Sequence, residues 1–387
     1  MADICIIAVT FDRPGSFARL FESLLRADYA GERVDLLVSI DGGPRSAGTE
    51  AAIGPLDWPH GECRIRRMPE NLGLRRHILH CGDESANYDA IILLEDDIVV
   101  GPGFYRFARW AIVQYAAEGQ VAGISLYAPA INEMAELPFA PVPSAYPAYA
   151  LQSAQSWGQC WTRDMWAGFR GWYAAQTDAL KNEADMPDRI YSWPESSWKK
   201  YAMKYLVRTG KTWVYPYVSH STNCSDVGTH NRQKTALFQV PLAAEWTNPG
   251  DAPLNRLEHY DIYFEKENAT LAELTGKLEQ VPGGPLIFDL YGTRQQVTGP
   301  ANILTVRRLP RDPMAEIGLS FRPHDINALM ATPGTDAALY RIDEGETINL
   351  LNCNRQRTSR YHSNLDWRDS LLAGWQGLIS AVRRRLP

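Results

Sequence analysis

Residues 91–104 read IILLEDDIVVGPGF, an apolar run that ends in three consecutive carboxylates, Glu95, Asp96 and Asp97. Adjacent carboxylates repel one another, and burial at the end of a strand removes their hydration. Mg²⁺ and Mn²⁺ take oxygen ligands and relieve that repulsion. The stretch therefore predicts a buried strand whose end holds a divalent ion. The alternative is an acidic first turn for a helix that begins near Phe104, although the apolar residues 98–100 intervene.

Strand-like and helix-like patterns alternate on both sides of this stretch. Unbroken apolar runs that separate periodic helical segments are typical of an α/β fold, with a mainly parallel sheet covered by helices on both faces. We expect strands at 3–9, 34–40, 63–68, 90–94 and 121–127, and helices at 17–25, from 74, and at 104–115.

Acidic side chains follow three of these predicted strands. Asp12 follows the first, Asp41 the second, and the triplet at 95–97 the fourth. In parallel sheets, ligands bind beyond the carboxyl ends of the strands. The sequence therefore predicts that these acids line one charged pocket.

The second half of the chain is less regular. Residues 128–150 are rich in Pro and Ala and predict a loop, and residues 153–169 predict a short strand followed by a helix. The first domain ends with a helix from about Ser197, a strand around Trp213, and a loop at 219–231. We expect that this loop can become ordered over a bound ligand. We place that domain at 1–245, and a C-terminal accessory region with short strands at 246–387.

Composition narrows the class of protein. The 387 residues include 39 basic and 45 acidic side chains, a net charge of −6 without a basic stripe, which argues against a nucleic-acid partner. The six cysteines have no zinc-site spacing, and we find neither a signal peptide nor a membrane-spanning run. We expect a cytoplasmic protein with free thiols.

The C-terminal segment 366–387 has an apolar stripe followed by three arginines, Arg383, Arg384 and Arg385. This pattern is typical of an amphipathic helix that lies on anionic lipid. It is also typical of a terminal helix docked on its own domain with cations at the negative end of the helix dipole, which is the interpretation we favour. Peripheral contact with the inner membrane face is therefore one expectation for this segment.

Five stretches between residues 4 and 232 together resemble the GT-A nucleotide-sugar glycosyltransferases, most closely the N-acetylglucosaminyltransferase I type, which carries an EDD triplet. They occur in the family's order and are IIAVTFDRPGSFARLFESLL, VSIDGG, EDDIVVGPGFYRF, SWGQCWTRDMW, and SWPESSW with YPYVSHSTNCSDVGTHN. The resemblance implies a Mn²⁺- or Mg²⁺-dependent inverting transfer of a sugar, GlcNAc in that type, from a UDP-sugar to a glycan or glycolipid hydroxyl.

The resemblance also assigns roles to individual residues. Asp97 would be the direct metal ligand, Asp96 would face the ribose or the metal's water shell, and Glu95 would bond hydroxyls of the donor sugar. Arg13 would contact uracil or phosphate, and Asp41 would bind the base. His230 would contact the diphosphate, and Trp157 and Gly158 would line the pocket for the donor sugar.

The proton acceptor follows from the same resemblance. Glu195 stands two positions after Trp193, as the family's catalytic Asp follows its Trp, although Pro194 intervenes and Glu replaces Asp. Asp188 is the reserve candidate. Two alternatives remain open, a nucleotidyltransferase and a catalytically inactive sugar-nucleotide or glycan-binding module. The first normally has a Gly-rich phosphate loop that TFDRPGSF matches poorly.

Overall fold

The computed structural model describes residues 3–176, 179–181, 183–226, 236–267 and 285–355. The chain forms two compact units. Unit 1 comprises Met1–Ala269 with Thr293–Gln296, and unit 2 comprises Thr270–Gly292 with Val297–Pro387. Unit 1 therefore extends beyond the boundary near residue 245 that the sequence suggested. His230 and the segment 366–387 lie outside the described residues. No helix within the described ranges is long and apolar enough to cross a membrane.

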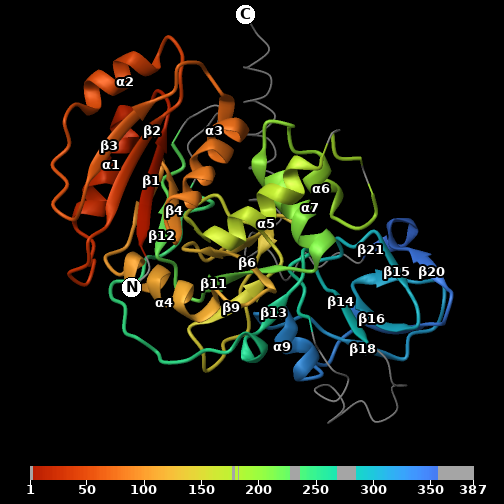
Figure 1. Cartoon of the computed structure of the whole chain (residues 1–387). Helices are drawn as coiled ribbons and strands as arrows, with labels where there is room; N and C mark the ends of the chain where they lie inside the picture. The colour runs from red at the N-terminus through yellow and green to blue at the C-terminus, as the bar shows by residue number, and fades with distance from the viewer. Residues whose placement is uncertain (1–2, 177–178, 182, 227–235, 268–284, 356–387) are drawn as a thin grey trace, which may run out of the picture. The chain divides into compact units, whose positions relative to one another are not determined.

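A nine-stranded sheet forms the centre of unit 1 (Figure 1). The parallel pairings of this sheet include β1–β2, β1–β4, β2–β3 and β6–β11. Strand β10 lies between β4 and β6 and is antiparallel to both. The prediction of a mainly parallel sheet is therefore confirmed. In spatial order the strands are β13 (His259–Tyr260), β9 (Ala148–Leu151), β11 (Thr212–Pro216), β6 (Val121–Ser125), β10 (Gln159–Thr162), β4 (Ala90–Glu95), β1 (Ile4–Thr10), β2 (Asp35–Ile40) and β3 (Cys63–Arg67).

Helices flank this sheet as expected. Every residue of β1 is buried, which requires cover on both faces. The helix α1 begins with Pro14 and buries Phe17, Leu20 and Leu24, the periodic positions seen in the sequence. The helices of unit 1 are α1 (Pro14–Leu25), α2 (Ser46–Ile53), α3 (Gly73–Gly82), α4 (Phe104–Tyr115), α5 (Arg163–Ala174), α6 (Asp188–Tyr191) and α7 (Trp198–Thr209), with 3-10 turns η1 (Asp83–Ala86) and η2 (Leu254–Arg256).

The prediction of a loop at 128–150 is wrong at its C-terminal end. Residues Ala148–Leu151 form β9, which is wholly buried and pairs with β11. A four-residue strand buried on both faces has no alternating pattern, so the Pro-rich flank concealed it. The same segment also contains the short pair β7 (Ile131–Asn132) and β8 (Leu137–Pro138).

Unit 2 contains a separate four-stranded sheet in the order β14 (Leu286–Asp289), β16 (Ala301–Thr305), β19 (Ala337–Ile342) and β18 (Ala315–Ile317). Its core includes Ile303, Tyr340 and Leu350. Strands β14, β16 and β19 fall on apolar runs that the sequence indicated, whereas β18 overlaps the run expected at 317–321 only at Ile317. Smaller elements complete the unit, namely the pairs β15 (Gln296–Thr298) with β20 (Thr347–Asn349) and β17 (Arg307–Arg308) with β21 (Asn354–Arg355), the helix α9 (His324–Leu329) and the turn η3 (Leu350–Asn352).

Candidate active site

The carboxyl ends of β1, β2 and β4 lie level with one another. Val9 pairs with Glu95 across β1 and β4, and Thr10 pairs with Ile40 across β1 and β2. The acids that follow these strands therefore meet at one edge of the sheet. They line a cavity of about 700 Å³ in unit 1, together with side chains from the β7–β8 segment, the loop before β10 and the start of α7.

Glu95 is the last residue of β4, and Asp96 and Asp97 form the turn to β5 (Ile98–Val100), which pairs with β12 (Ser221–Asn223). Because β5 and Gly103 precede α4, the triplet is not the first turn of that helix. Asp96 is 2% exposed. Its Oδ2 accepts a hydrogen bond of 2.7 Å from Thr10, and its Oδ1 pairs with the Arg13 guanidinium. Both oxygens of Asp96 are therefore engaged within the protein.

Burial makes the triplet electrostatically costly. It raises the pKa of Glu95 to about 8, with further contributions from Asp97 and Asp96. Burial also raises the pKa of Asp96 to about 6, while Arg13 opposes the shift. The Arg13 guanidinium thus pairs with a cluster of three carboxyl groups. The site therefore favours the binding of additional positive charge.

Asp97 differs from Asp96 in having an oxygen to spare. Its Oδ2 lies 3.4 Å from Arg13 Nη1, whereas its buried Oδ1 has no hydrogen-bond partner among the residues that the structure describes. Within the described ranges, no group of three or more His, Cys, Asp or Glu side chains is arranged to hold a metal ion. A single carboxylate nevertheless suits Mg²⁺ or Mn²⁺ when waters and substrate phosphates complete the coordination. The orphaned Oδ1 therefore fits the predicted ion.

Asp41 organises the neighbouring part of the cavity. Its Oδ1 accepts hydrogen bonds of 2.8 Å from the amides of Gly42 and Leu72, and its Oδ2 accepts one of 3.0 Å from Gly73. The carboxylate thereby fixes the loop that leads into α3. Each carboxylate oxygen has two acceptor positions, so Oδ2 retains one for a ligand.

Phe11, Asp12 and Arg45 complete this end of the cavity. The Arg45 guanidinium lies 5.1 Å from the centroid of the Phe11 ring and pairs with Asp12 at 2.6 Å. A planar aromatic side chain and a planar cation therefore lie together beside Asp41, which is a suitable environment for a planar heterocycle.

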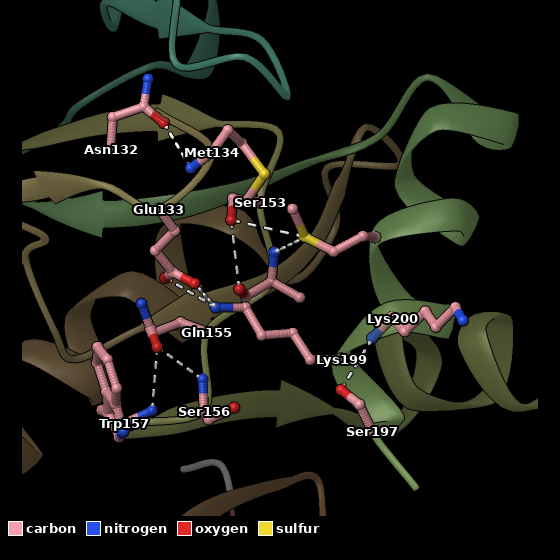
Figure 2. A network of polar contacts seen from close by, with 12 residues as sticks. Asn132, Glu133, Met134, Ser153, Gln155, Ser156, Trp157, Ser197, Lys199 and Lys200 are labelled. Atoms are coloured by element: carbon pink, nitrogen blue, oxygen red, sulfur yellow. Dashed lines mark hydrogen bonds and ion pairs between the residues drawn. The ribbon is translucent and has the colours of Figure 1, made fainter. Parts of the chain in front are cut away.

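Trp157 and Gly158 lie in the loop that precedes β10. The side-chain oxygen of Gln155 accepts hydrogen bonds from the amides of Ser156 and Trp157 (Figure 2). The Trp157 ring packs 4.9 Å from Tyr127 and 4.8 Å from Phe238, measured between centroids, and lines the cavity. Gly158 has a φ of +103°, and a Cβ there would lie 2.8 Å from Ser221 Oγ.

Neither predicted proton acceptor is among the residues that line the cavity. Glu195 accepts hydrogen bonds from Lys200 Nζ at 2.6 Å and from the Tyr201 hydroxyl at 2.5 Å, and its side chain is 46% exposed. These bonds lower the pKa of Glu195. Asp188 accepts a bond of 2.8 Å from Gln295 Nε2 at an exposed position.

The structure also places in the cavity an ion pair that sequence reasoning missed. Lys199 Nζ donates to both oxygens of Glu133, at 2.8 and 2.7 Å (Figure 2). The two side chains are 10% and 15% exposed. The partners are 66 positions apart in the chain, so no local motif reveals them. Asp226, which pairs with Arg19 and accepts a bond from Ser16 at 2.6 Å, is a second acid that the motifs did not identify.

Comparison with known proteins gives the following. No protein-family model matches the chain. No curated protein matches it. Among solved structures, it is similar to a mannosyltransferase, PcManGT from Pyrobaculum calidifontis in complex with GDP-Man and Mn²⁺, with 12% identity, a TM-score of 0.28, and coverage of 42% of this chain and 47% of that one.

It is also similar to Staphylococcus aureus TarS, residues 1–349, in complex with UDP-GlcNAc, with 10% identity, a TM-score of 0.38, and coverage of 59% of this chain and 60% of that one. The match spans less than two thirds of each of these solved chains. Such distant likenesses do not decide an activity, which has to be argued from the cavity itself.

Proposed function

We propose that the protein is a metal-dependent inverting glycosyltransferase that moves a sugar, GlcNAc by the resemblance, from a UDP-sugar to a hydroxyl of a glycan or glycolipid. The observation that carries this proposal is the buried, unpartnered Oδ1 of Asp97 in a cavity where acids from three parallel strands meet. A divalent ion bound there with a diphosphate satisfies that oxygen and offsets the charge of the triplet.

The donor would lie along the cavity with its base near Asp41 and its sugar near Trp157. Asp41 Oδ2 has an acceptor position available for the N–H of uracil, next to Phe11 and Arg45. Arg13 stands between the base end and the triplet, within reach of a phosphate. Glu95 has no hydrogen bond from any described side chain or amide and is free to accept from sugar hydroxyls. Trp157 offers an apolar face to the sugar ring.

The chemistry follows from these positions. The ion held by Asp97 would stabilise the charge that develops on the departing diphosphate. Arg13, already paired with Asp96 and Asp97, would orient the phosphate chain through its fork of donors. A carboxylate must take the proton of the attacking hydroxyl. Glu195 remains the prediction from the resemblance, to be tested beside the acids of the cavity.

The first experiment is calorimetric titration of UDP, UDP-GlcNAc, UDP-Glc and GDP-mannose, each with Mn²⁺ and with EDTA. We expect a UDP-sugar to bind only with Mn²⁺, and Asp97→Asn to weaken that binding about 100-fold or more, since it removes the charged ligand of the ion. Asp89→Asn, a matched change at the opposite end of β4 where the carboxylate is exposed, should leave binding unchanged.

Two outcomes would contradict the proposal. Binding that is unaffected by EDTA and by Asp97→Asn would exclude the metal role. Release of pyrophosphate in place of UDP during turnover would identify a nucleotidyltransferase. Circular dichroism of each variant establishes that the fold is retained.

A further inference from the structure

We propose that Glu133 is the general base that takes the proton of the acceptor hydroxyl, and that Lys199 positions it. This assignment rests on the proposed glycosyl transfer and concerns the residue that completes it. Glu133 comes from the turn between β7 and β8, and Lys199 from the first turn of α7, so neither belongs to the strand ends that would hold the nucleotide.

The location of Glu133 meets the geometric requirement for a base. Its carboxylate lines the same cavity as Gln155, Ser156 and Trp157, the segment that would hold the donor sugar. The Glu133–Lys199 pair therefore lies at the sugar end of the cavity, where an acceptor hydroxyl has to reach the anomeric carbon.

The hydrogen bonding of Glu133 suits the same task. Both carboxylate oxygens bind one ammonium, at 2.8 and 2.7 Å, so each oxygen keeps an acceptor position for a hydroxyl. The side chain is 15% exposed, enough to be reached from the cavity while remaining fixed. The Lys199 ammonium also lies 5.4 Å from the centroid of the Trp193 ring, which further restricts its position. A base held this firmly loses little entropy when the acceptor arrives.

The other acids that line the cavity are committed to different partners. The triplet is assigned to the metal and the donor, and Asp41 accepts three backbone amides. The remaining acids are bound by arginines: Asp12 by Arg45 at 2.6 Å, Asp226 by Arg19, and Glu136 by Arg189 at 2.6 Å on a side chain that is 66% exposed. Glu195 faces Lys200 and Tyr201 and does not line the cavity.

The step balances without a further reactant. The acceptor oxygen forms a bond to the anomeric carbon as its proton passes to an oxygen of Glu133. The bond from that carbon to the β-phosphate oxygen breaks, and its electron pair leaves with the diphosphate. Glu133 then returns the proton to water. Lys199 holds the carboxylate in place through both of its oxygens.

The test compares Glu133→Gln with Glu118→Gln, the same change at an exposed position that does not line the cavity. The probes are UDP-GlcNAc with Mn²⁺ and a panel of p-nitrophenyl glycosides, with UDP release as the rate. We expect Glu133→Gln to lower kcat about 100-fold or more, the range of general-base catalysis, while the dissociation constant of UDP-GlcNAc changes less than about twofold. Glu118→Gln should retain wild-type values of both.

Lys199 is tested as a positioning residue. Lys199→Met should lower kcat without changing donor affinity, and Lys199→Arg should recover much of the rate, since it restores a cation to Glu133. Thermal unfolding of all variants shows whether the fold is kept, and Glu133→Asp serves as a second variant where Gln at this buried pair unfolds the protein.

Two results would overturn the assignment and can be told apart. A wild-type rate in Glu133→Gln, or a hundredfold loss confined to Glu195→Gln, refutes the role of Glu133 and leaves the glycosyltransferase proposal standing. Wild-type protein that does not bind UDP-GlcNAc in the presence of Mn²⁺ contradicts the proposed function itself, and the base assignment with it.

Discussion

His220 should make the protein lose stability in mild acid. The imidazole is 2% exposed and stacks on Phe107 with 4.6 Å between centroids, and its Nδ1 has no hydrogen-bond partner within the described part of the chain. Burial lowers the pKa of this side chain to about 4. An unfolded histidine titrates near pH 6.5. Between about pH 4 and pH 6.5, His220 is therefore protonated in the unfolded chain and neutral in the folded chain.

The sign and size of the effect follow from proton linkage. His220 is a base whose pKa is lower in the folded state than in the unfolded state. Its contribution to the free energy of unfolding is therefore fully present above about pH 6.5 and falls as the pH drops toward 4. For a shift from about 6.5 to about 4, the free energy of unfolding falls by about 2 kcal/mol between pH 7 and pH 5. The carbonyl of His220 accepts from the Gly101 amide at the end of β5, so the loss should reach the turn that carries the acidic triplet.

Urea unfolding at pH 7 and pH 5, followed by tryptophan fluorescence, measures this loss in the wild type and in His220→Phe. The phenyl ring preserves the stacking on Phe107 and cannot be protonated, so the variant should lose about 2 kcal/mol less than the wild type over that interval. His80→Gln, at an exposed position on α3, should behave as the wild type. An equal loss in the wild type and His220→Phe would refute the reasoning.

Two further predictions concern the frame of the cavity, and both are measured by thermal and urea unfolding. Gly158→Ala should destabilise unit 1 by about 2 kcal/mol, because φ is +103° and the new Cβ would lie 2.9 Å from Leu126 Cβ. An unchanged midpoint of unfolding would show that the loop relaxes freely. Lys200→Met should lower the free energy of unfolding by about 3 kcal/mol, because it leaves Glu195 and the carbonyls of Tyr191 and Trp193 without their shared donor. Lys211→Met, at an exposed hydrogen bond, should lower it little.

The sequence predicted the parts of this molecule that are encoded by contiguous residues. Strands β1 and β4 are unbroken apolar runs, and the triplet at 95–97 directly follows one of them, so both the parallel sheet and its acidic edge could be anticipated. Strand β9 could not, because four residues buried on both faces show no period. The partners of the triplet could be anticipated only in part, since Thr10 and Arg13 reach it across 83 to 86 positions.

The buried lysines of α7 were beyond sequence reasoning for a different reason. Lys199, Lys200 and Lys204 are 8%, 3% and 4% exposed, although a pattern of lysines on a helix normally indicates a solvated face. Their burial depends on carboxylates supplied by separate segments, Glu133, Glu195 and Asp185. A buried ammonium without such a partner is strongly unfavourable, so each lysine fixes the segment that carries its acid.

This arrangement of lysines bears directly on which acid faces the substrate. Lys199 and Lys200 bind acids from two different segments, although both also contact Trp193, Lys199 at its ring and Lys200 at its carbonyl. Lys200 and Tyr201 bind Glu195, which does not line the cavity. Lys199 holds Glu133 at the cavity wall instead. Glu195, which the tryptophan motif singles out, is thus paired with Lys200, while Glu133, which we propose as the base, lines the cavity.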